Sequence, residues 1–291
     1  MGRRPVNKLP FGLKNSQLVH ISDVEPGLKC ECFCPACRHP LVAKKGRIKI
    51  HHFAHDRSSQ CKHAYETSIH LAAKKVIEQA GYIQLPNLEH EYEIINTRQQ
   101  ARLSFDQTRI YFDKIYLESK FHDIVPDILI EKDGRLLCIE IFVTHEVDEQ
   151  KRKKVEGSKL SAIEIDLSKI DRSINFESLK EIVVNSVENK RWLFNSKFDS
   201  KRSGLYRKIL RNSIRRKIIP HGLIGGHVDD CPRPPGAWNG KPCANVRHDC
   251  FYCKYFVIPE SGYPEEGVVY CIGHKTEEEI NNLLGSEKTK A

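Results

Sequence analysis

Cysteines constrain this chain more than any other feature of its sequence. The chain has 291 residues and eleven cysteines, and ten of these fall in two clusters, Cys30 to Cys61 and Cys231 to Cys271. An odd number of cysteines cannot be fully paired, and the first residues include basic side chains but no apolar stretch typical of a secretory signal. Clustered Cys-x-x-Cys pairs without an export signal are typical of zinc sites in a reducing compartment. The sequence therefore predicts a cytoplasmic protein with two small zinc-binding modules.

The first cluster contains eight candidate zinc ligands. A Cys-x-x-Cys pair is followed by a loop long enough for one β-hairpin and then by a His-x-x-His pair, which is typical of a four-ligand zinc ribbon. The set that fits this spacing best is Cys34, Cys37, His52 and His55. Cys61 is an alternative to one of the histidines, and the two histidines are also placed to pack beside the helix expected after them.

The second cluster contains five cysteines for four positions in a zinc site. We expect the ligands to be Cys243, Cys250, Cys253 and Cys271, with Cys231 outside the set. About 50 residues rich in glycine and proline cannot bury much apolar area, so a structural metal is the expected source of stability. His248 or His274 could replace one of the cysteines, and free thiols in a loose segment or an iron–sulfur cluster are the alternative interpretations.

Positive charge is concentrated in one part of the chain. The formal net charge is +9, and residues 185–221 hold eleven Lys and Arg against two acids, a difference of nine that equals the whole excess. A local basic segment on an otherwise neutral chain indicates a polyanionic partner. We expect nucleic acid, DNA ahead of RNA, and the alternative is a solvated linker helix. The residues predicted to contact phosphates are Arg207, Lys208, Arg211, Arg215, Arg216 and Lys217.

The composition changes along the chain predict five regions. These are a zinc-ribbon-like module at 1–62, an α/β core at 63–195, a basic linker at 196–222, a Cys-rich zinc module at 223–276 and a polar tail at 277–291. No run of about 18 apolar residues occurs, so we expect no membrane-spanning helix.

The core region alternates helical and strand patterns. We expect helices near 65–80, 146–160 and 177–192, and strands near 90–95, 109–117, 124–130, 136–143 and 162–167. The Lys132-Asp133-Gly134 segment between two apolar runs predicts a β-hairpin. This order of elements predicts an α/β fold with a mixed sheet.

Two acidic residues interrupt the apolar strands of this hairpin. Asp127 follows Pro126 in the first strand, and Glu140 lies within Leu-Cys-Ile-Glu-Ile-Phe-Val in the second. A buried carboxylate is costly unless it is paired or binds a metal. Because neighbouring strands lie about 4.8 Å apart, two such carboxylates would repel each other without a cation between them. The pair predicts a site for Mg²⁺ or Mn²⁺. The alternative is that Asp127 lies at a strand end and that Glu140 pairs with a lysine.

A third acid lies on the helix before the hairpin. Glu66, His70 and Lys74 follow one another at four-residue steps on the edge of the apolar stripe. They form a polar ridge that is able to face the hairpin, although a surface ladder of i, i+4 pairs has the same spacing.

These motifs resemble a known nuclease core. Pro126-Asp127, a strand and turn, and then Glu140-Ile141-Phe142 resemble the PD-(D/E)XK nuclease core. The helix motif from Glu66 to Lys74, preceded by Cys34-x-x-Cys37 and by the His-Phe-Ala-His segment that ends at His55, more narrowly resembles the competence protein CoiA family. The resemblance covers about residues 25–195. It implies a restriction-endonuclease-like core flanked by the two zinc modules.

The sequence departs from the nuclease pattern at one position. Phe142 stands where the pattern has lysine, and CoiA-like proteins are similar in often lacking a lysine there. Lys151 and Lys154 on the following helix, with His145 after the strand, are the candidates for a relocated cation. The alternative for the two lysines is a solvated helix face.

The resemblance implies a metal-dependent nuclease that hydrolyses phosphodiester bonds. Asp127 and Glu140 would hold Mg²⁺, with the Ile141 carbonyl as a further ligand, Glu66 would position a water or second ion, and Lys154 would supply the cation. Two alternatives remain open, which are a nucleic-acid-binding protein with a degenerate nuclease core and a zinc-ribbon adaptor that binds protein. The adaptor hypothesis leaves the two strand acids unexplained.

Overall fold

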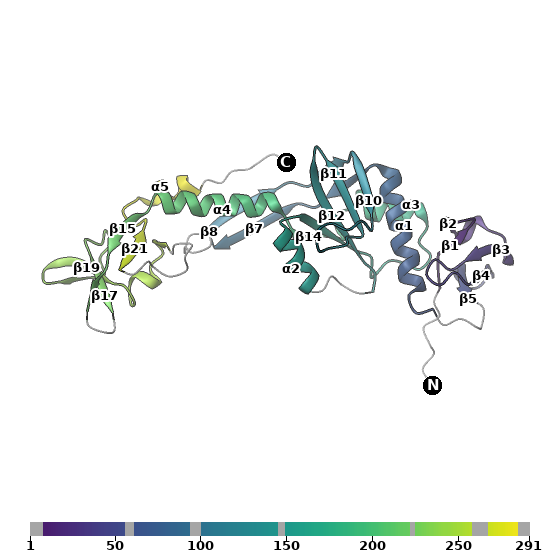
Figure 1. Ribbon diagram of the computed structural model, residues 1–291, viewed down its shortest axis with the longest axis horizontal. Helices are drawn as coiled ribbons and strands as arrows, with labels where there is room; N and C mark the ends of the chain where they lie inside the picture. The colour runs from purple at the N-terminus through teal and green to yellow at the C-terminus, as the bar shows by residue number, and fades with distance from the viewer. Residues whose placement is uncertain are drawn as a thin grey trace, which may run out of the picture. The chain divides into compact units, whose positions relative to one another are not determined.

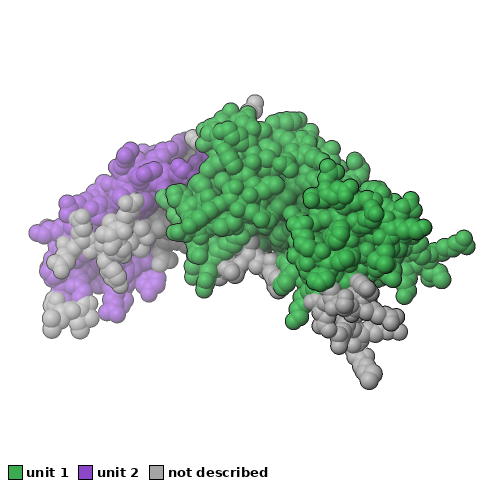
Figure 2. Space-filling model, turned by 45° about the vertical axis from the view of Figure 1, so that its right-hand side comes forward, with its two compact units in different colours: residues 1–87, 107–195 green, residues 88–106, 196–291 purple. Residues whose placement is uncertain are grey.

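The computed structural model describes residues 8–55, 61–93, 100–144, 149–221, 225–257 and 267–284. It is a mixed α/β structure with several sheets (Figure 1). The chain divides into two compact units, one formed by residues 1–87 and 107–195 and the other by residues 88–106 and 196–291 (Figure 2).

The first unit begins with a five-stranded antiparallel sheet in the order β2-β1-β3-β4-β5. Its elements are β1 (Phe11–Lys14), β2 (Gln17–His20), the short 3₁₀ helix η1 (Ile21–Asp23), β3 (Gly27–Phe33), β4 (Pro40–Lys44) and β5 (His52–His55). Leu41 and Phe53 are buried between these strands. Phe11 and Leu13 belong instead to the apolar core of the next sheet, so the two sheets share one core.

A mixed five-stranded sheet forms the centre of this unit, in the order β10-β11-β12-β13-β14. Its strands are β10 (Lys114–Leu117), β11 (Ile128–Lys132), β12 (Arg135–Phe142), β13 (Ser161–Asp166) and β14 (Lys190–Phe194). Only the β12–β13 pair is parallel among these neighbours, and α2 (Glu149–Ser158) lies between the two strands in sequence. A separate two-stranded sheet pairs β6 (Tyr82–Leu85) with β9 (Thr108–Tyr111).

Alternate residues of β12 and its neighbours face two different cores, because side chains along a strand point to opposite faces. Ile139 and Ile141 pack with α1 (Ala64–Ala80) and the helical segment 176–185. Cys138 packs on the other face with Val155 of α2. The sheet is therefore covered on both faces by helices (Figure 1).

Local sequence signals account for α1 and for the hairpin. Buried Ile69, Ala73 and Val76 recur at helical spacing in α1, and Gly81 ends the helix with φ 70°, a left-handed conformation that suits glycine. The β11–β12 turn places Asp133 and Gly134 at φ 50° and 71°, as expected for a tight hairpin turn. The predicted helix and hairpin are both present.

The helix predicted near 177–192 is much shorter than expected. α3 (Phe176–Lys180) continues into a π-helical turn, η2 (Glu181–Asn185), and the chain then becomes the edge strand β14. Strand β14 pairs with β13, and the Lys190 amine donates to the carbonyl oxygens of Gln84 and Val184 at 2.9 and 3.2 Å. These tertiary hydrogen bonds and the sheet pairing outweigh the helical pattern of the segment.

Among its described residues, the second unit contains one hairpin, two further sheets of short strands and two α-helices. The hairpin pairs β7 (Leu88–Glu93) with β8 (Gln100–Phe105). One sheet has the order β15-β21-β20 and the other β16-β17-β19-β18. The bounds are α4 (Ser196–Arg211), β15 (Ile214–Lys217), β16 (Ile219–Pro220), β17 (Gly226–Asp229), β18 (Gly236–Trp238), β19 (Lys241–Asn245), η3 (Cys250–Tyr252), β20 (Phe256–Val257), β21 (Val268–Cys271) and α5 (Glu277–Leu284).

The segment 196–222 was expected to be a basic linker, but its described part forms the folded elements α4, β15 and β16 of this unit. Tyr206 and Ile209 of α4 are buried in a core with Leu103 of β8 and Ile280 of α5. The basic side chains of α4 therefore lie on a helix whose opposite face is packed.

Candidate functional site

Asp127 lies between α1 and β12 and is contacted by both. It precedes β11 directly, so it lies at the strand end rather than inside the strand. One carboxylate oxygen, Oδ1, lies 3.1 Å from Nζ of Lys74 and 3.4 Å from Nδ1 of His70. The other, Oδ2, accepts a hydrogen bond of 3.0 Å from the Ile141 amide. The helix and the hairpin thus converge on one carboxylate.

The surroundings of Asp127 favour its charged form. Burial alone would raise its pKa, but the hydrogen bond and charge of His70, followed by Lys74 and the Ile141 amide, lower the pKa of Asp127 below its usual range. Lys74 is almost fully buried, with 4% of its surface exposed, and it also pairs with Glu118 at 2.8 Å. A buried ammonium group that bridges two carboxylates holds this part of the site in place.

Glu140 is the second carboxylate, and it is 2% exposed. Its Oε2 lies 2.6 Å from Nζ of Lys151 on α2, and the Cys138 thiol approaches its Oε1 at 3.5 Å. Burial raises the pKa of Glu140, Lys151 opposes this effect, and the charge of Asp127 adds to it. Glu140 is therefore a buried acid whose charge depends on a cation beside it.

The two carboxylates lie close together in unlike environments. The charge of Asp127 raises the pKa of Glu140, and Ile141, the residue after Glu140, donates its amide to Asp127. One group is held ionised while burial favours protonation of the other. Hard oxygen donors of this kind suit a divalent cation, which would favour the ionised form of both.

The other residues predicted for this site lie near it but make different contacts. Glu66, one turn before His70 on α1, lies 3.8 Å from His63 rather than against either carboxylate. Lys154 is exposed on α2, and Lys151 is the lysine that reaches Glu140. Phe142 is half-buried at the end of β12. His145 lies outside the described residues.

The sequence analysis missed one buried acid next to this pair. Glu164 on β13 is 1% exposed, lies opposite Glu140 in the parallel register, and is bound by Arg191 at 2.7 Å. It interrupts the apolar run Ala162 to Ile165, which is the same signal that identified Glu140.

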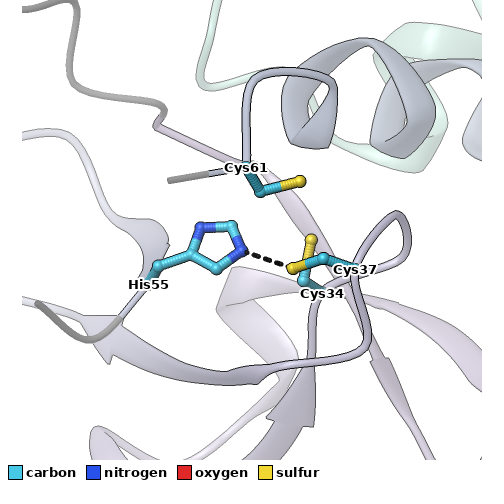
Figure 3. Close-up of side chains that lie close together, drawn as sticks. All are labelled: Cys34, Cys37, His55 and Cys61. Atoms are coloured by element: carbon cyan, nitrogen blue, oxygen red, sulfur yellow. Dashed lines mark hydrogen bonds between the residues drawn. The ribbon is translucent and has the colours of Figure 1, made fainter. Parts of the chain in front are cut away.

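A cluster of three cysteines and one histidine forms a candidate zinc centre in the first unit (Figure 3). The ligand atoms of Cys34, Cys37, His55 and Cys61 all lie within 4.8 Å of one another, and the four side chains point toward a common centre. Cys34 and Cys37 lie in the turn between β3 and β4, His55 ends β5, and Cys61 precedes α1. Such a set of soft and borderline donors could bind zinc, and doing so would tie the small sheet to α1.

The thiols of this cluster have unlike acidities. Burial raises the pKa of Cys34 to about 12. Burial acts in the same direction on Cys37, but hydrogen bonds from His39, His55 and Cys34 outweigh it and lower the pKa of Cys37 to about 6. His55 Nε2 lies 3.2 Å from the Cys37 sulfur. The surroundings of Cys37 therefore favour its thiolate, which is the form that binds a metal.

Cys61 takes the place that the sequence analysis gave to His52. His52 is buried, and its Nδ1 lies 2.8 Å from the Ile50 carbonyl oxygen. In β5 it is three residues from His55, and an odd separation along a strand places the two side chains on opposite faces. A His-x-x-His pair therefore cannot place both rings on one metal while it stays in a regular strand.

Three of the four ligands predicted for the second zinc site line one cavity. Cys250, Cys253 and Cys271 line one cavity, but Cys243 on β19 is not among the residues that line it. Cys231 is.

The basic residues predicted to contact phosphates divide into two groups. Arg207, Lys208 and Arg211 are exposed on α4, and Arg215 and Lys217 are exposed on β15. Arg216 is half-buried between the last two and lines the cavity of the cysteines. Alternation along the strand explains why Arg216 faces the other way.

No helix in the described part of the chain is long and apolar enough to cross a membrane.

Comparison with known families gives a match in the first unit. Residues 20–64 match the family model for the competence protein CoiA N-terminal domain. The matched segment contains all four residues of the Cys₃His cluster and ends at the first residue of α1. No curated protein and no solved structure matches the chain. The match supports the resemblance to CoiA over this segment and leaves the two carboxylates and the second unit outside it.

Proposed function

We propose that this chain is a metal-dependent nuclease with a CoiA-like N-terminal segment and a PD-(D/E)XK-like core. The observation that carries the proposal is the meeting of Asp127 and Glu140, with Lys151 beside Glu140. Glu140 is buried and Asp127 is half-buried. Carboxylates withdrawn from water are costly to maintain, and a site that needs two of them is a functional site more often than a structural one.

The donor set fits Mg²⁺ or Mn²⁺. Asp127 and Glu140 both offer carboxylate oxygens, and Asp127 is already held in its ionised form. When bound, a divalent cation would acidify a water and stabilise charge on the phosphate. His70 and Lys74 hold Asp127 in place, and the Nε2 atom of His70 is buried without a hydrogen-bond partner among the described residues.

Lys151 fills the role that Phe142 cannot. Its ammonium group reaches Glu140 from α2 rather than from the strand. It would neutralise Glu140 before a metal binds, and it would stabilise negative charge on a phosphate afterwards. Glu66, one turn of α1 away from His70, is proposed to hold a water or a second ion. The exposed amine of Lys154 is proposed only to contact a phosphate.

The basic surface of α4 and β15 is the proposed contact for nucleic acid, DNA ahead of RNA. Exposed Arg207, Lys208 and Arg211 lie on one helix, and each would neutralise a phosphate without reading sequence. The substrate class in this proposal is thus a phosphodiester polymer.

A second candidate function is a nucleic-acid-binding protein with a degenerate nuclease core. It is favoured by the ion pairs themselves, since Lys74 and Lys151 already neutralise Asp127 and Glu140. In that case the acids are structural.

One panel separates the two candidates. The purified full chain is incubated with end-labelled single- and double-stranded DNA and RNA, in Mg²⁺, Mn²⁺ or EDTA, and binding to the same substrates is followed by fluorescence anisotropy. The nuclease proposal predicts cleavage of at least one substrate with a divalent metal and none with EDTA. Binding to the whole panel without cleavage under any metal would instead establish the degenerate core.

A further inference from the structure

Four cysteines of the second unit line one cavity. Cys231 follows β17, Cys250 begins the short helix η3, Cys253 follows that helix, and Cys271 ends β21. All four belong to the lining of a cavity of about 290 Å³, which is otherwise mainly apolar and includes Val228 and Phe256. The fifth cysteine of this unit, Cys243, is absent from the lining.

The thiols are near enough to affect one another. Burial raises the pKa of Cys250 to about 12, and the neighbouring Cys231, Cys253 and Cys271 add to this effect. Cys250 is buried, and Cys231, Cys253 and Cys271 are half-buried. A thiophilic metal would bind the four sulfurs as thiolates and release their protons.

The backbone around these sulfurs is arranged as it is around a bound thiolate. The Gly273 amide donates to the Cys271 sulfur at 3.2 Å. A Cβ at Gly273 would lie 3.2 Å from that sulfur and 3.3 Å from Cγ of Pro232, so a side chain there would crowd the thiol. Cys253 donates its amide to the Cys250 carbonyl at 3.0 Å, which closes the turn of the Cys-x-x-Cys pair.

Arg216 supplies a positive charge to the same cavity. It lines the cavity, and its Nε is buried without a hydrogen-bond partner among the described residues. Four thiolates around a divalent metal carry a net negative charge. An arginine with an unused donor is therefore a suitable neighbour for that charge and for the sulfur lone pairs.

We propose that Cys231, Cys250, Cys253 and Cys271 form a second, all-thiolate metal centre, with Cys243 excluded. Two metals share this chemistry, zinc and an iron–sulfur cluster. Among the described residues, the Cys₃His cluster is the one group whose ligand atoms all lie within 4.8 Å of one another. The four cavity thiols are therefore not all within 4.8 Å of one another. A zinc ion would draw them together, and a polynuclear cluster would tolerate a wider spacing.

The test begins with the wild-type full chain, purified without oxygen. Its metal content is measured by elemental analysis, and its visible absorption is recorded, because an iron–sulfur cluster is coloured and zinc is not. Either two zinc ions per chain, or one zinc together with iron and visible absorption, is expected. One zinc and no other metal would overturn the proposal.

The ligands are then identified by thiol alkylation and mass spectrometry on the same native protein. Cys231, Cys250, Cys253 and Cys271 should all be protected and become reactive together when a chelator removes the metal, while Cys243 reacts in both conditions. Protection of Cys243 with labelling of Cys231 would contradict the assignment.

A matched pair of variants completes the test. Cys231→Ser should lose the second centre and keep the zinc of the Cys₃His cluster, and Cys243→Ser should keep both. Because the alkylation experiment uses only wild-type protein, it decides the question even where Cys231→Ser does not fold. Equal metal loss in both variants would overturn the exclusion of Cys243.

Discussion

Nζ of Lys151 lies 2.6 Å from Oε2 of Glu140, although the two residues belong to different elements, α2 and β12. Lys154, three residues further along the same helix, is exposed. Lys151 thus places a cation beside the buried acid Glu140. The nuclease pattern would place this cation on a lysine two residues after the acid.

The proposed role of Lys151 predicts unequal effects for the two lysines. Lys151→Met should lower the cleavage rate by about 100-fold or more, the usual cost of losing one electrostatic contact to the reacting group. Lys154→Met removes an equal charge from the same helix and should change the rate by less than about threefold, as expected for a surface substitution. Single-turnover cleavage on one substrate measures both. Similar losses in the two variants would assign the effect to general charge on α2.

The Cys₃His cluster predicts which residue holds the first zinc. Cys61→Ser should lower the bound zinc by one equivalent per chain and lower the melting temperature, because binding to structural zinc sites contributes about 10–16 kcal/mol to folded peptides of this kind. His52→Gln should leave the zinc content unchanged, since Gln is able to keep a hydrogen bond to the Ile50 carbonyl. Elemental analysis of the two variants checks this. Zinc loss in His52→Gln with retention in Cys61→Ser would restore the Cys₂His₂ set.

Lys190 predicts a pH dependence of stability. Burial lowers the pKa of Lys190 to about 7, and the amine is held by two carbonyl oxygens. Between about pH 7 and pH 10 the unfolded chain holds a proton that the folded chain has lost, so the free energy of unfolding rises with pH by at most about 1.4 kcal/mol per unit. Lys190→Met lacks this contribution. From pH 7 to pH 10, the free energy of unfolding of the wild type should therefore rise relative to that of Lys190→Met, as measured by chemical denaturation. A difference between the two proteins that is the same at both pH values would contradict this prediction.

The basic face of α4 predicts a salt dependence of binding. Replacing Arg207, Lys208 and Arg211 by Gln should weaken binding to all nucleic acids alike and reduce the slope of log affinity against log salt by about 0.9 for each lost phosphate contact. A triple Gln variant of Lys29, Lys44 and Lys49, which are exposed in the first unit, removes the same charge elsewhere. Equal slopes for the two variants would show that α4 makes no specific phosphate contact. Arg216 is left intact because it lines the cysteine cavity.

Local patterns predicted the elements that present the site. The apolar spacing of α1, its Gly81 end and the Asp133-Gly134 turn are short-range signals, and each produced the expected element. The segment after Asn185 was predicted as helix, but it leads into the strand β14. Its pairing partner, β13, lies more than twenty residues earlier in the chain. Pairing of that kind leaves little trace in local periodicity.

Side-chain partners were harder to predict than elements. The choice between Lys151 and Lys154 depended on which face of α2 packs, and Val155 was the available signal. Val155 is buried against the sheet, and Lys151 lies four residues before it on the same face, whereas Lys154 is its direct neighbour in sequence. The choice between His52 and Cys61 depended on the pleat of β5, which the Cys-x-x-Cys spacing does not reveal.

The central claim is that Asp127 belongs to a metal-dependent hydrolytic site. The most direct measurement compares cleavage by wild type, Asp127→Asn and Asp133→Asn with Mg²⁺ or Mn²⁺, with binding measured in parallel by anisotropy. Asp133 lies exposed at the tip of the same hairpin, at φ 50°, which Asn also adopts readily. The account predicts cleavage by wild type and Asp133→Asn, and a loss of about 100-fold or more in Asp127→Asn with binding retained. Cleavage by Asp127→Asn at the wild-type rate would contradict it.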